Sequence, residues 1–234
     1  MNFYLDSTDF GRIIITARRD CRRLVARWKD RRLHLTVPQG THKEEVLDFL
    51  ERHHDSIARL AHPAIDYRLG QKFDCFRCHL ILGEQTYDPA RILFGHEGDD
   101  LYLNLPKGLD LDSDLARHNI SAAMQMLMAN KASSLLLPYA REVADGLGAK
   151  PQGFRVGRGL KKLGHCTRQG IIQFSRNVMF LPEELVHLIV CHELAHLSHF
   201  NHSPQFHALL NSYVDGHEKE LEHRLKVFAW PIVM

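Results

Sequence analysis

The sequence predicts an α+β chain in which a β-rich lobe, residues 1–112, precedes a mainly helical lobe, residues 113–234. Two observations predict this order. Short segments of the first half alternate apolar and polar residues, which is the period of a half-buried strand. From about residue 114 the apolar residues recur every three or four positions, which is the period of a helix.

The first lobe is expected to hold several short strands and one helix. Leu33, Leu35 and Val37 show the strand alternation most clearly. Strands are expected at residues 13–15, 33–37, 79–82, 91–94 and 101–105. Thr41 and Glu44 have the spacing of a capping box, and apolar residues at helical spacing then predict a helix to about residue 60. We expect no internal repeat.

The second lobe is expected to begin with a long helix from about residue 114. Pro138 should break or restart this helix, and Gly146 and Gly148 should end it. Strands are expected at residues 154–156 and 171–174. Residues 185–197 are apolar on nearly every side, so they predict a buried helix, with Pro182 near its first turn.

Composition and charge exclude several classes of protein. The 234 residues are 44% hydrophobic and 25% charged, and 30 basic residues nearly balance 28 acidic ones, so no global field favours nucleic acid or membranes. No apolar run reaches the length of a membrane span, and the first residues do not resemble a secretory signal. Five cysteines in such a chain favour a reducing compartment, and we expect a cytoplasmic protein.

The charge is distributed unevenly. Residues 12–32 hold nine basic residues, against only Asp20 and Asp30.

The expected buried helix contains His192, Glu193 and His196. One helical turn separates the two histidines, so both imidazoles can reach one zinc ion, while Glu193 lies about 100° round the helix and can take a proton from the ion's water. Chance alone gives this H-E-x-x-H pattern about once in sixteen sequences with 17 His and 12 Glu. The buried context strengthens the prediction, because unpaired polar side chains in a core cost about 1–3 kcal/mol each.

A third ligand is expected from a later histidine. His199 lies about 10 Å further along the same helix, so its side chain would be strained in reaching the ion. His202 is the better candidate, because Asn201 suits a helix end and Ser203–Pro204 suits the start of a new helix. The chain is therefore expected to turn at Asn201 and His202.

These residues resemble the YgjP-like metal-dependent hydrolases, which are classed as metallopeptidases and are related to the SprT-like zinc proteases. The resemblance rests on stretches of the second lobe, namely Leu163-Gly164-His165-Cys166, Gly170 to Phe174, Asn177, Leu181-Pro182 and His192 through Phe206. In the first lobe it rests on Arg23-Leu24, on Leu33 to Pro38, and on Glu45-Val46 with Phe49-Leu50.

The resemblance covers most of the chain, with a divergent middle around residues 70–110. It implies a zincin-like catalytic lobe, zinc as the metal, His192, His196 and His202 as ligands, and Glu193 as the catalytic residue. The chain departs from the family at Leu163-Gly164-His165-Cys166, where Trp-Gly-Ser-Cys is usual.

Several cysteines are weighed against the main site. Cys75, Cys78 and His79 match the haem-attachment pattern C-x-x-C-H and could also contribute to a second zinc site, but free thiols are the favoured interpretation. Cys191 is expected to pack as a small hydrophobe, and Cys166 to pack beside the site rather than act as a nucleophile.

Other polar residues could serve substrate binding. A basic stretch before the zinc helix, comprising Arg155, Arg158, Lys161, Lys162, His165 and Arg168, is read mainly as solvated surface and secondarily as a rim for an anionic substrate. Tyr213 and His217 are candidates for stabilising an oxyanion. The strand at residues 171–174 could be the edge that accepts an extended peptide.

The preferred prediction is a zinc-dependent hydrolase of metallopeptidase type that acts on a peptide or protein, with Glu193 activating the zinc's water. One alternative keeps the zinc but hydrolyses a nucleotide phosphoanhydride. Another is a non-catalytic, zinc-containing module that binds nucleic acid or another partner. Glu193 speaks against this second alternative, because a structural zinc needs no general base.

Overall fold

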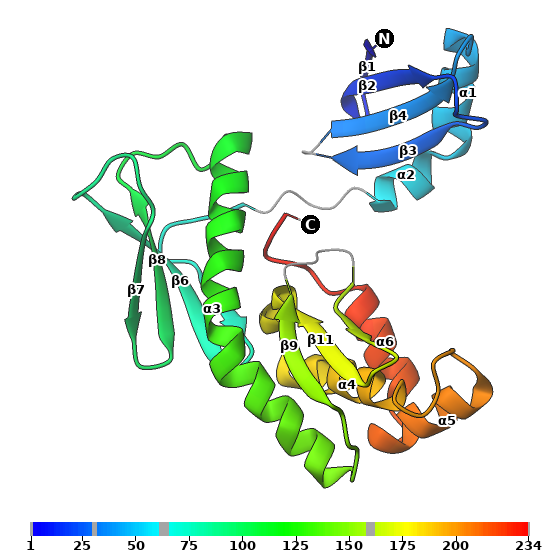
Figure 1. Cartoon of the computed structure of the whole chain (residues 1–234). Helices are drawn as coiled ribbons and strands as arrows, with labels where there is room; N and C mark the ends of the chain where they lie inside the picture. The colour runs from blue at the N-terminus through cyan, green and yellow to red at the C-terminus, as the bar shows by residue number, and fades with distance from the viewer. Residues whose placement is uncertain (1, 30–31, 61–65, 158–161, 234) are drawn as a thin grey trace. The chain divides into compact units, whose positions relative to one another are not determined.

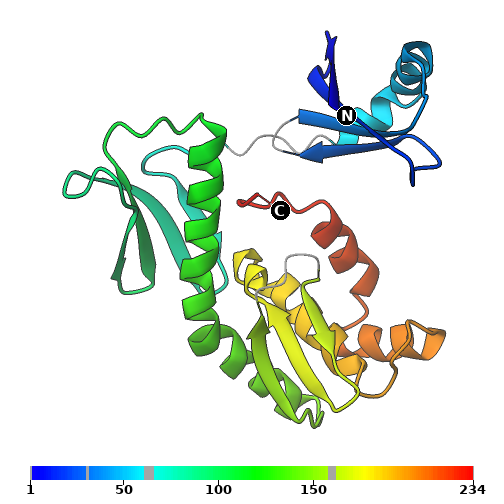
Figure 2. The same cartoon turned by 45° about the horizontal axis from the view of Figure 1, so that its top comes forward.

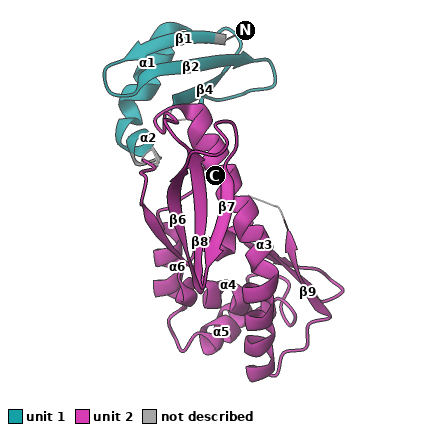
Figure 3. Cartoon of the chain, turned by 90° about the vertical axis from the view of Figure 1, so that its left-hand side faces the viewer, with its two compact units in different colours: residues 1–64 teal, residues 65–234 magenta. Residues whose placement is uncertain are grey.

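The computed structural model describes residues 2–29, 32–60, 66–157 and 162–233. It divides into two compact units, Met1–Ala64 and Ile65–Met234 (Figure 3). Helices and strands both contribute throughout, so the α+β prediction is confirmed. The predicted lobe boundary at residues 112–113 does not coincide with the division between the units and falls inside the second unit.

The first unit is a four-stranded sheet followed by two helices (Figure 1). Its elements are β1 (Asn2–Ser7), β2 (Gly11–Arg18), β3 (Val25–Lys29), β4 (Arg32–Pro38), α1 (Lys43–Arg52) and α2 (His54–Leu60). The strand order is β1-β2-β4-β3, with β2 and β4 parallel and the other pairs antiparallel. Strands β1 and β3 were not expected from the sequence.

The helices cover one face of this sheet. Ile13 of β2 and Leu33 and Leu35 of β4 are fully buried, and they pack with Val46 of α1 and Ile57 of α2. Because side chains alternate along a strand, the residues between these core positions point to the opposite face.

The predicted capping box is wrong by one residue. Helix α1 begins after His42, whose backbone N–H donates to the carboxylate of Glu45 at 2.9 Å. The Thr41 hydroxyl instead donates to the carbonyl of Pro38 at 2.9 Å and so closes the preceding turn. The single helix expected to residue 60 is also divided, at His53, into α1 and α2.

The second unit begins with another four-stranded sheet and a long helix. The elements are β5 (Lys72–Cys75), β6 (Cys78–Gln85), β7 (Leu93–Glu97), β8 (Asp100–Pro106) and α3 (Asp114–Gly146), and the strand order is β5-β6-β8-β7. Figure 2 shows α3 running alongside this sheet, and Leu80, Leu82 and Leu103 share a core with Ile120 and Met124 of α3.

Helix α3 does not break at Pro138, contrary to the prediction. It runs for 33 residues from the N-cap Ser113, whose side chain accepts a hydrogen bond from the backbone of Ala116. Pro138 lies inside the helix, where its ring costs one backbone hydrogen bond, and the neighbouring Leu136 and Tyr139 are buried in the core. Tertiary packing therefore outweighs the local preference.

The two sheets repeat one another, although no repeat was expected. Both have the strand order 1-2-4-3 with a parallel central pair. The sequence of β4 and its turn, Leu33-His-Leu-Thr-Val-Pro-Gln-Gly40, matches that of β8, Leu101-Tyr-Leu-Asn-Leu-Pro-Lys-Gly108. Four of these eight positions are identical, and the others keep their polar or apolar character.

The last third of the chain carries a three-stranded sheet and the remaining helices. These are β9 (Gly153–Gly157), β10 (Gly164–Cys166), β11 (Ile171–Ser175), the short 3-10 helix η1 (Arg176–Phe180), α4 (Glu183–Ala195), α5 (Pro204–Tyr213) and α6 (Glu218–Lys226). The strand order is β10-β11-β9. The strand at residues 171–174, expected to be an edge, is therefore central, and β10 is an edge strand.

Helix α4 is buried along most of its length, as predicted. It contacts α3, α5, α6 and β10. Within the described residues, no helix has the length and apolarity that a membrane crossing requires.

Candidate metal centre and its cleft

The end of helix α4 brings three histidines together. His192 lies in its last turn, and His196 caps its C-terminus. The chain then turns and restarts as α5, where Ser203 is the N-cap and Pro204 occupies the first turn. His202 lies directly before this second cap, so its ring returns to the end of α4.

His199 is not on the helix, contrary to the prediction. Helix α4 ends at Ala195, so the turn begins earlier than Asn201. The backbone carbonyl of His199 accepts a hydrogen bond from Nδ1 of His196 at 2.9 Å. This bond places the proton of a neutral His196 ring on Nδ1 and leaves its Nε2 lone pair directed away from that contact.

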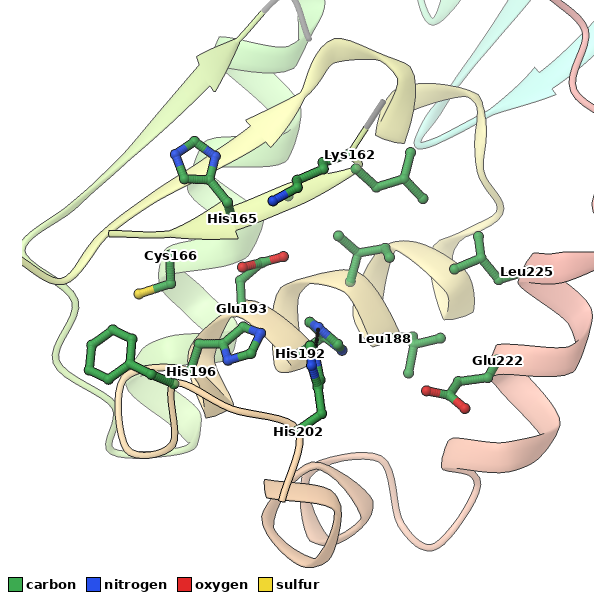
Figure 4. Close-up of a pocket in the computed structure, with 14 residues that line it drawn as sticks. Lys162, His165, Cys166, Leu188, His192, Glu193, His196, His202, Glu222 and Leu225 are labelled. Carbon is green, nitrogen blue, oxygen red and sulfur yellow. Dashed lines mark hydrogen bonds between the residues drawn. The ribbon is translucent and has the colours of Figure 1, made fainter. Parts of the chain in front are cut away.

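The three rings converge on one point (Figure 4). Nε2 of His192 lies 3.2 Å from Nε2 of His202, and one ligand atom from each of His192, His196 and His202 lies within 4.8 Å of the others. The ring of Phe206 packs against all three, with centroid distances of 5.0, 4.6 and 4.8 Å. In the part of the chain that the structure describes, no other group of three or more His, Cys, Asp or Glu side chains has this spacing.

The histidine triad fits a metal ion. Two nitrogens bound tetrahedrally at about 2.0–2.1 Å lie roughly 3.3 Å apart, close to the separation of His192 and His202. Burial, and then the neighbouring histidines, lower the pKa of His192 to about 4. Its ring is therefore neutral at physiological pH, which is the form that donates a lone pair to a metal.

Glu193 lies beside the triad and is only 4% exposed. Its carboxylate extends toward β10 (Figure 4), and its Oε2 has no hydrogen-bond partner among the described residues. Burial raises the pKa of Glu193 to about 7, and the positive charge of Lys162 partly opposes this shift. A buried carboxyl group with an unoccupied oxygen and a pKa near neutrality is suited to accepting and returning a proton.

Gly164 of β10 makes room for this carboxylate. A Cβ at position 164 would lie 2.6 Å from Oε1 and 2.7 Å from Cγ of Glu193, closer than real Cβ contacts. Any larger residue would therefore have to displace Glu193.

The triad and Glu193 line a cleft of about 510 Å³. Its walls come from β10, α4, the loop after α4, and α6. The lining residues are Lys162, Leu163, Gly164, His165, Cys166, Leu188, Ile189, His192, Glu193, His196, Phe200, His202, Glu222 and Leu225. Such a volume is typical of a small-ligand or short-peptide site.

The edge strand β10 has backbone groups for which the described residues provide no strand partner. The carbonyl of Leu163 accepts from Ser175 at 2.7 Å, and the N–H of Thr167 donates to Ile171 at 2.9 Å, so both residues face β11. Because hydrogen bonding alternates along an antiparallel strand, the backbone groups of Gly164 and Cys166 face away from β11. They are available to an added strand.

The cysteine candidates divide as follows. Cys75 and Cys78 are free thiols opposite each other in the β5–β6 hairpin, and the His79 ring is hydrogen-bonded to Asp74 at 3.0 Å. Burial raises the pKa of Cys191 to about 12, and its sulfur contacts His187 at 3.4 Å. Cys166 lines the cleft, and burial raises its pKa as well. Neither Cys166 nor Cys191 is thus an activated thiolate.

Of the basic residues proposed for an anionic substrate, Lys162 and His165 line the cleft. Arg155 and Arg168 do not, and Arg158 and Lys161 lie outside the described residues. Tyr213 and His217 are absent from the cleft lining, and His217 lines a different cavity on the α4–α6 side together with His187.

Sequence reasoning missed several residues that shape the site. Gly164 was noted only as part of a motif, and Phe206, which packs on the three rings, was not singled out. Phe206 lies in the first turn of α5, close in sequence to His202, and this proximity is a weak signal that could have indicated contact. Leu188, Glu222 and Leu225 line the cleft from helices whose packing the sequence does not specify.

A histidine triad beside a buried carboxyl group is an arrangement of hydrolytic metal centres. A comparison with protein families agrees with a hydrolytic metal centre. Residues 22–227 match the model of the YgjP-like metallopeptidase domain, and the chain belongs to this family. It is accordingly a hydrolase of metallopeptidase type, and the resemblance stated from the sequence is confirmed.

Comparison with solved structures finds the metallopeptidase zymogen of Pyrococcus abyssi abylysin. That protein is 27% identical, and the match covers 37% of this chain and 87% of abylysin with a TM-score of 0.34. No curated protein matches the chain significantly.

Proposed function

We propose that this protein is a zinc-dependent peptidase in which His192, His196 and His202 hold the metal and Glu193 is the general base. The observation that carries the proposal is the convergence of three imidazoles beside a buried carboxylate with an unpartnered oxygen. Three histidine nitrogens without a fourth protein ligand are characteristic of catalytic zinc sites. A zincin-like lobe and a cytoplasmic location are parts of the same proposal.

When bound, zinc would lower the pKa of its water molecule to near 7. The chain's own residues do the rest. Glu193 takes the proton from the attacking water at its free Oε2 and returns it to the leaving amine. Phe206 restricts the orientation of the three rings, and Gly164 lets the Glu193 carboxylate occupy its position.

A peptide is the substrate that the cleft supports best. The outward-facing backbone groups of Gly164 and Cys166 can pair with an extended segment of substrate, as strands pair in β-augmentation. Such a segment would lie along β10, beside Glu193. Leu188, Ile189 and Leu225 offer an apolar wall for one of its side chains.

The nucleotide alternative receives less support from the same cleft. A polyphosphate requires several converging cations, and among the described basic residues of the stretch only Lys162 and His165 line the cleft. Glu193 and Glu222 add negative charge there. The non-catalytic alternative leaves the buried Glu193 without a role.

A substrate experiment separates these functions. Zinc-loaded protein should cleave an unfolded, reduced protein or a library of short peptides, and it should leave nucleoside triphosphates intact. Lys162→Ala should change peptide hydrolysis by only a few fold, because peptide binding depends mainly on main-chain hydrogen bonds and apolar contacts. Rapid triphosphate hydrolysis without peptide cleavage, lost by about 10-fold or more in Lys162→Ala, would establish the nucleotide function instead.

A further inference from the structure

The sheet of the first unit has a second face that its own helices do not cover. The core cluster takes its residues from one face only, including Ile13, Leu33 and Leu35. By alternation, the other face carries Arg12 and Arg18 of β2, Arg27 of β3 and Arg32 of β4. All four arginines are exposed, and we call this surface the arginine face.

An aromatic residue lies on the arginine face among these cations. Tyr4 of β1 is 64% exposed, and the Arg12 guanidinium lies 5.8 Å from its ring centroid. The strand register aligns Tyr4, Ile14, His34 and Arg27 in one row across the four strands. Two of these arginines have acidic partners: Asp6, which alternation places on this face, pairs with Arg12 at 3.2 Å, and Asp20 pairs with Arg18 at 2.6 Å.

The repeated sheet of the second unit shows that the fold does not need these arginines. Aligning Leu33–Gly40 with Leu101–Gly108 and following the strand registers gives each arginine a counterpart. Arg12, Arg18, Arg27 and Arg32 correspond to His79, Gln85, Gly95 and Asp100. Tyr4 corresponds to Lys72. The same topology forms without the cations or the aromatic ring, so the strand order alone does not explain their presence.

We propose that the arginine face binds single-stranded nucleic acid. Arginines spread over a sheet can neutralise phosphates along a strand, and an exposed tyrosine ring offers a stacking surface for a base. A four-stranded sheet whose exposed aromatic side chains stack on unpaired bases is also a known mode of RNA recognition. Among the described residues of the first unit, no helix or strand pair rises from the arginine face to enter a duplex groove, so single strands fit it better.

The site is independent of the metal centre, because all of its residues belong to the first unit. It also does not follow from the net charge, which is only +2 for the whole chain.

Fluorescence anisotropy on the full-length, zinc-loaded protein tests the proposal. The probes are a labelled 20-nucleotide oligo(dT), an oligo(U) of equal length, and a duplex DNA of equal length, each at low salt. We expect the single strands to bind at least several-fold more tightly than the duplex, and the affinity to fall steeply with salt.

Matched variants locate the site. Arg12→Glu/Arg27→Glu should weaken single-strand binding at least 10-fold and reduce the salt dependence. The control Arg52→Glu/Arg68→Glu makes the same charge change at exposed positions that are not part of the arginine face, and it should change binding less than 3-fold. Tyr4→Ala should weaken binding about 5-fold or more, whereas Tyr4→Phe, which keeps a ring, should not. Circular dichroism and peptide hydrolysis should be unchanged in each variant.

Three outcomes would overturn the proposal. One is the absence of oligonucleotide binding at low salt. Another is equal weakening by the arginine-face variant and by its control, which would indicate a diffuse charge effect. The third is binding to vesicles of anionic phospholipid with no affinity for oligonucleotides, which would make the arginine face a membrane-contacting surface.

Discussion

A Cβ at Gly164 would lie 2.6 Å from Oε1 of Glu193, so the edge strand β10 and helix α4 pack this closely only because residue 164 is a glycine. The nearest atoms all belong to the Glu193 side chain, which has to move if the glycine is replaced. The position of the proposed general base is thus fixed by a residue on another element of the fold.

Gly164→Ala should therefore impair catalysis more than metal binding. We expect kcat/KM for peptide hydrolysis to fall about 100-fold, because a small misplacement of a reacting group has an effect of this order. Zinc content should remain near that of the unaltered protein. Gly153→Ala is the matched control, because an added Cβ there meets nothing within 4 Å. Equal activity of the two variants would show that the Glu193 position does not matter.

The third metal ligand is tested by comparing two histidines of one loop. His202→Ala should lose most of its bound zinc, because His202 supplies a ring nitrogen to the triad. His199→Ala should keep its zinc, since His199 contributes a backbone carbonyl to His196 and alanine retains that group. Metal content measured by atomic absorption after dialysis decides the matter. Zinc loss in the His199 variant alone would mean that His199, and not His202, is the third metal ligand.

Because Glu193 is buried, the stability of the metal-free protein should depend on pH. Its pKa is raised from 4.5 to about 7 in the folded state, so the folded state binds the proton more tightly than the unfolded state does. The stability that comes from the neutral carboxyl group is fully present below about pH 4.5 and is lost as the pH rises through 7.

Glu193→Gln stays neutral at all these pH values and should not show the loss. Urea unfolding of chelator-treated proteins at pH 5 and pH 8 measures the effect. From pH 5 to pH 8, the free energy of unfolding of the unaltered chain should fall relative to that of the variant. The pKa difference predicts a fall on the order of 3 kcal/mol. A difference between the two proteins that does not change with pH would show that Glu193 titrates normally.

Much of the metal centre could be predicted from the sequence, because its signal is local. His192, Glu193 and His196 lie within one helical turn, and their geometry follows from helical periodicity. His202 followed from the cap residues Ser203 and Pro204, whose preferences are equally local. The structure brings the three histidines together, while their metal-binding role stays a prediction until metal is measured.

The features that sequence reasoning missed depend on contacts between distant elements. Helix α3 continues through Pro138 because buried neighbours hold it, and no local rule gives the strength of that packing. The central position of β11 depends on its pairing with β9 and β10, which strand patterns alone do not specify. The sequence match between β4 and β8 covers only eight residues, too few to indicate a repeat alone. The shared strand order of the two sheets shows that it is one.

In the proposed mechanism, Glu193 acts as a base beside a metal that it does not bind. The most direct measurement is zinc content and peptide hydrolysis on the same preparation of Glu193→Gln. Zinc should remain near one equivalent per chain, and kcat should fall by a factor on the order of 10² to 10⁴. A variant that loses its zinc would make Glu193 a ligand, and one that keeps both zinc and full activity would contradict its role as the base.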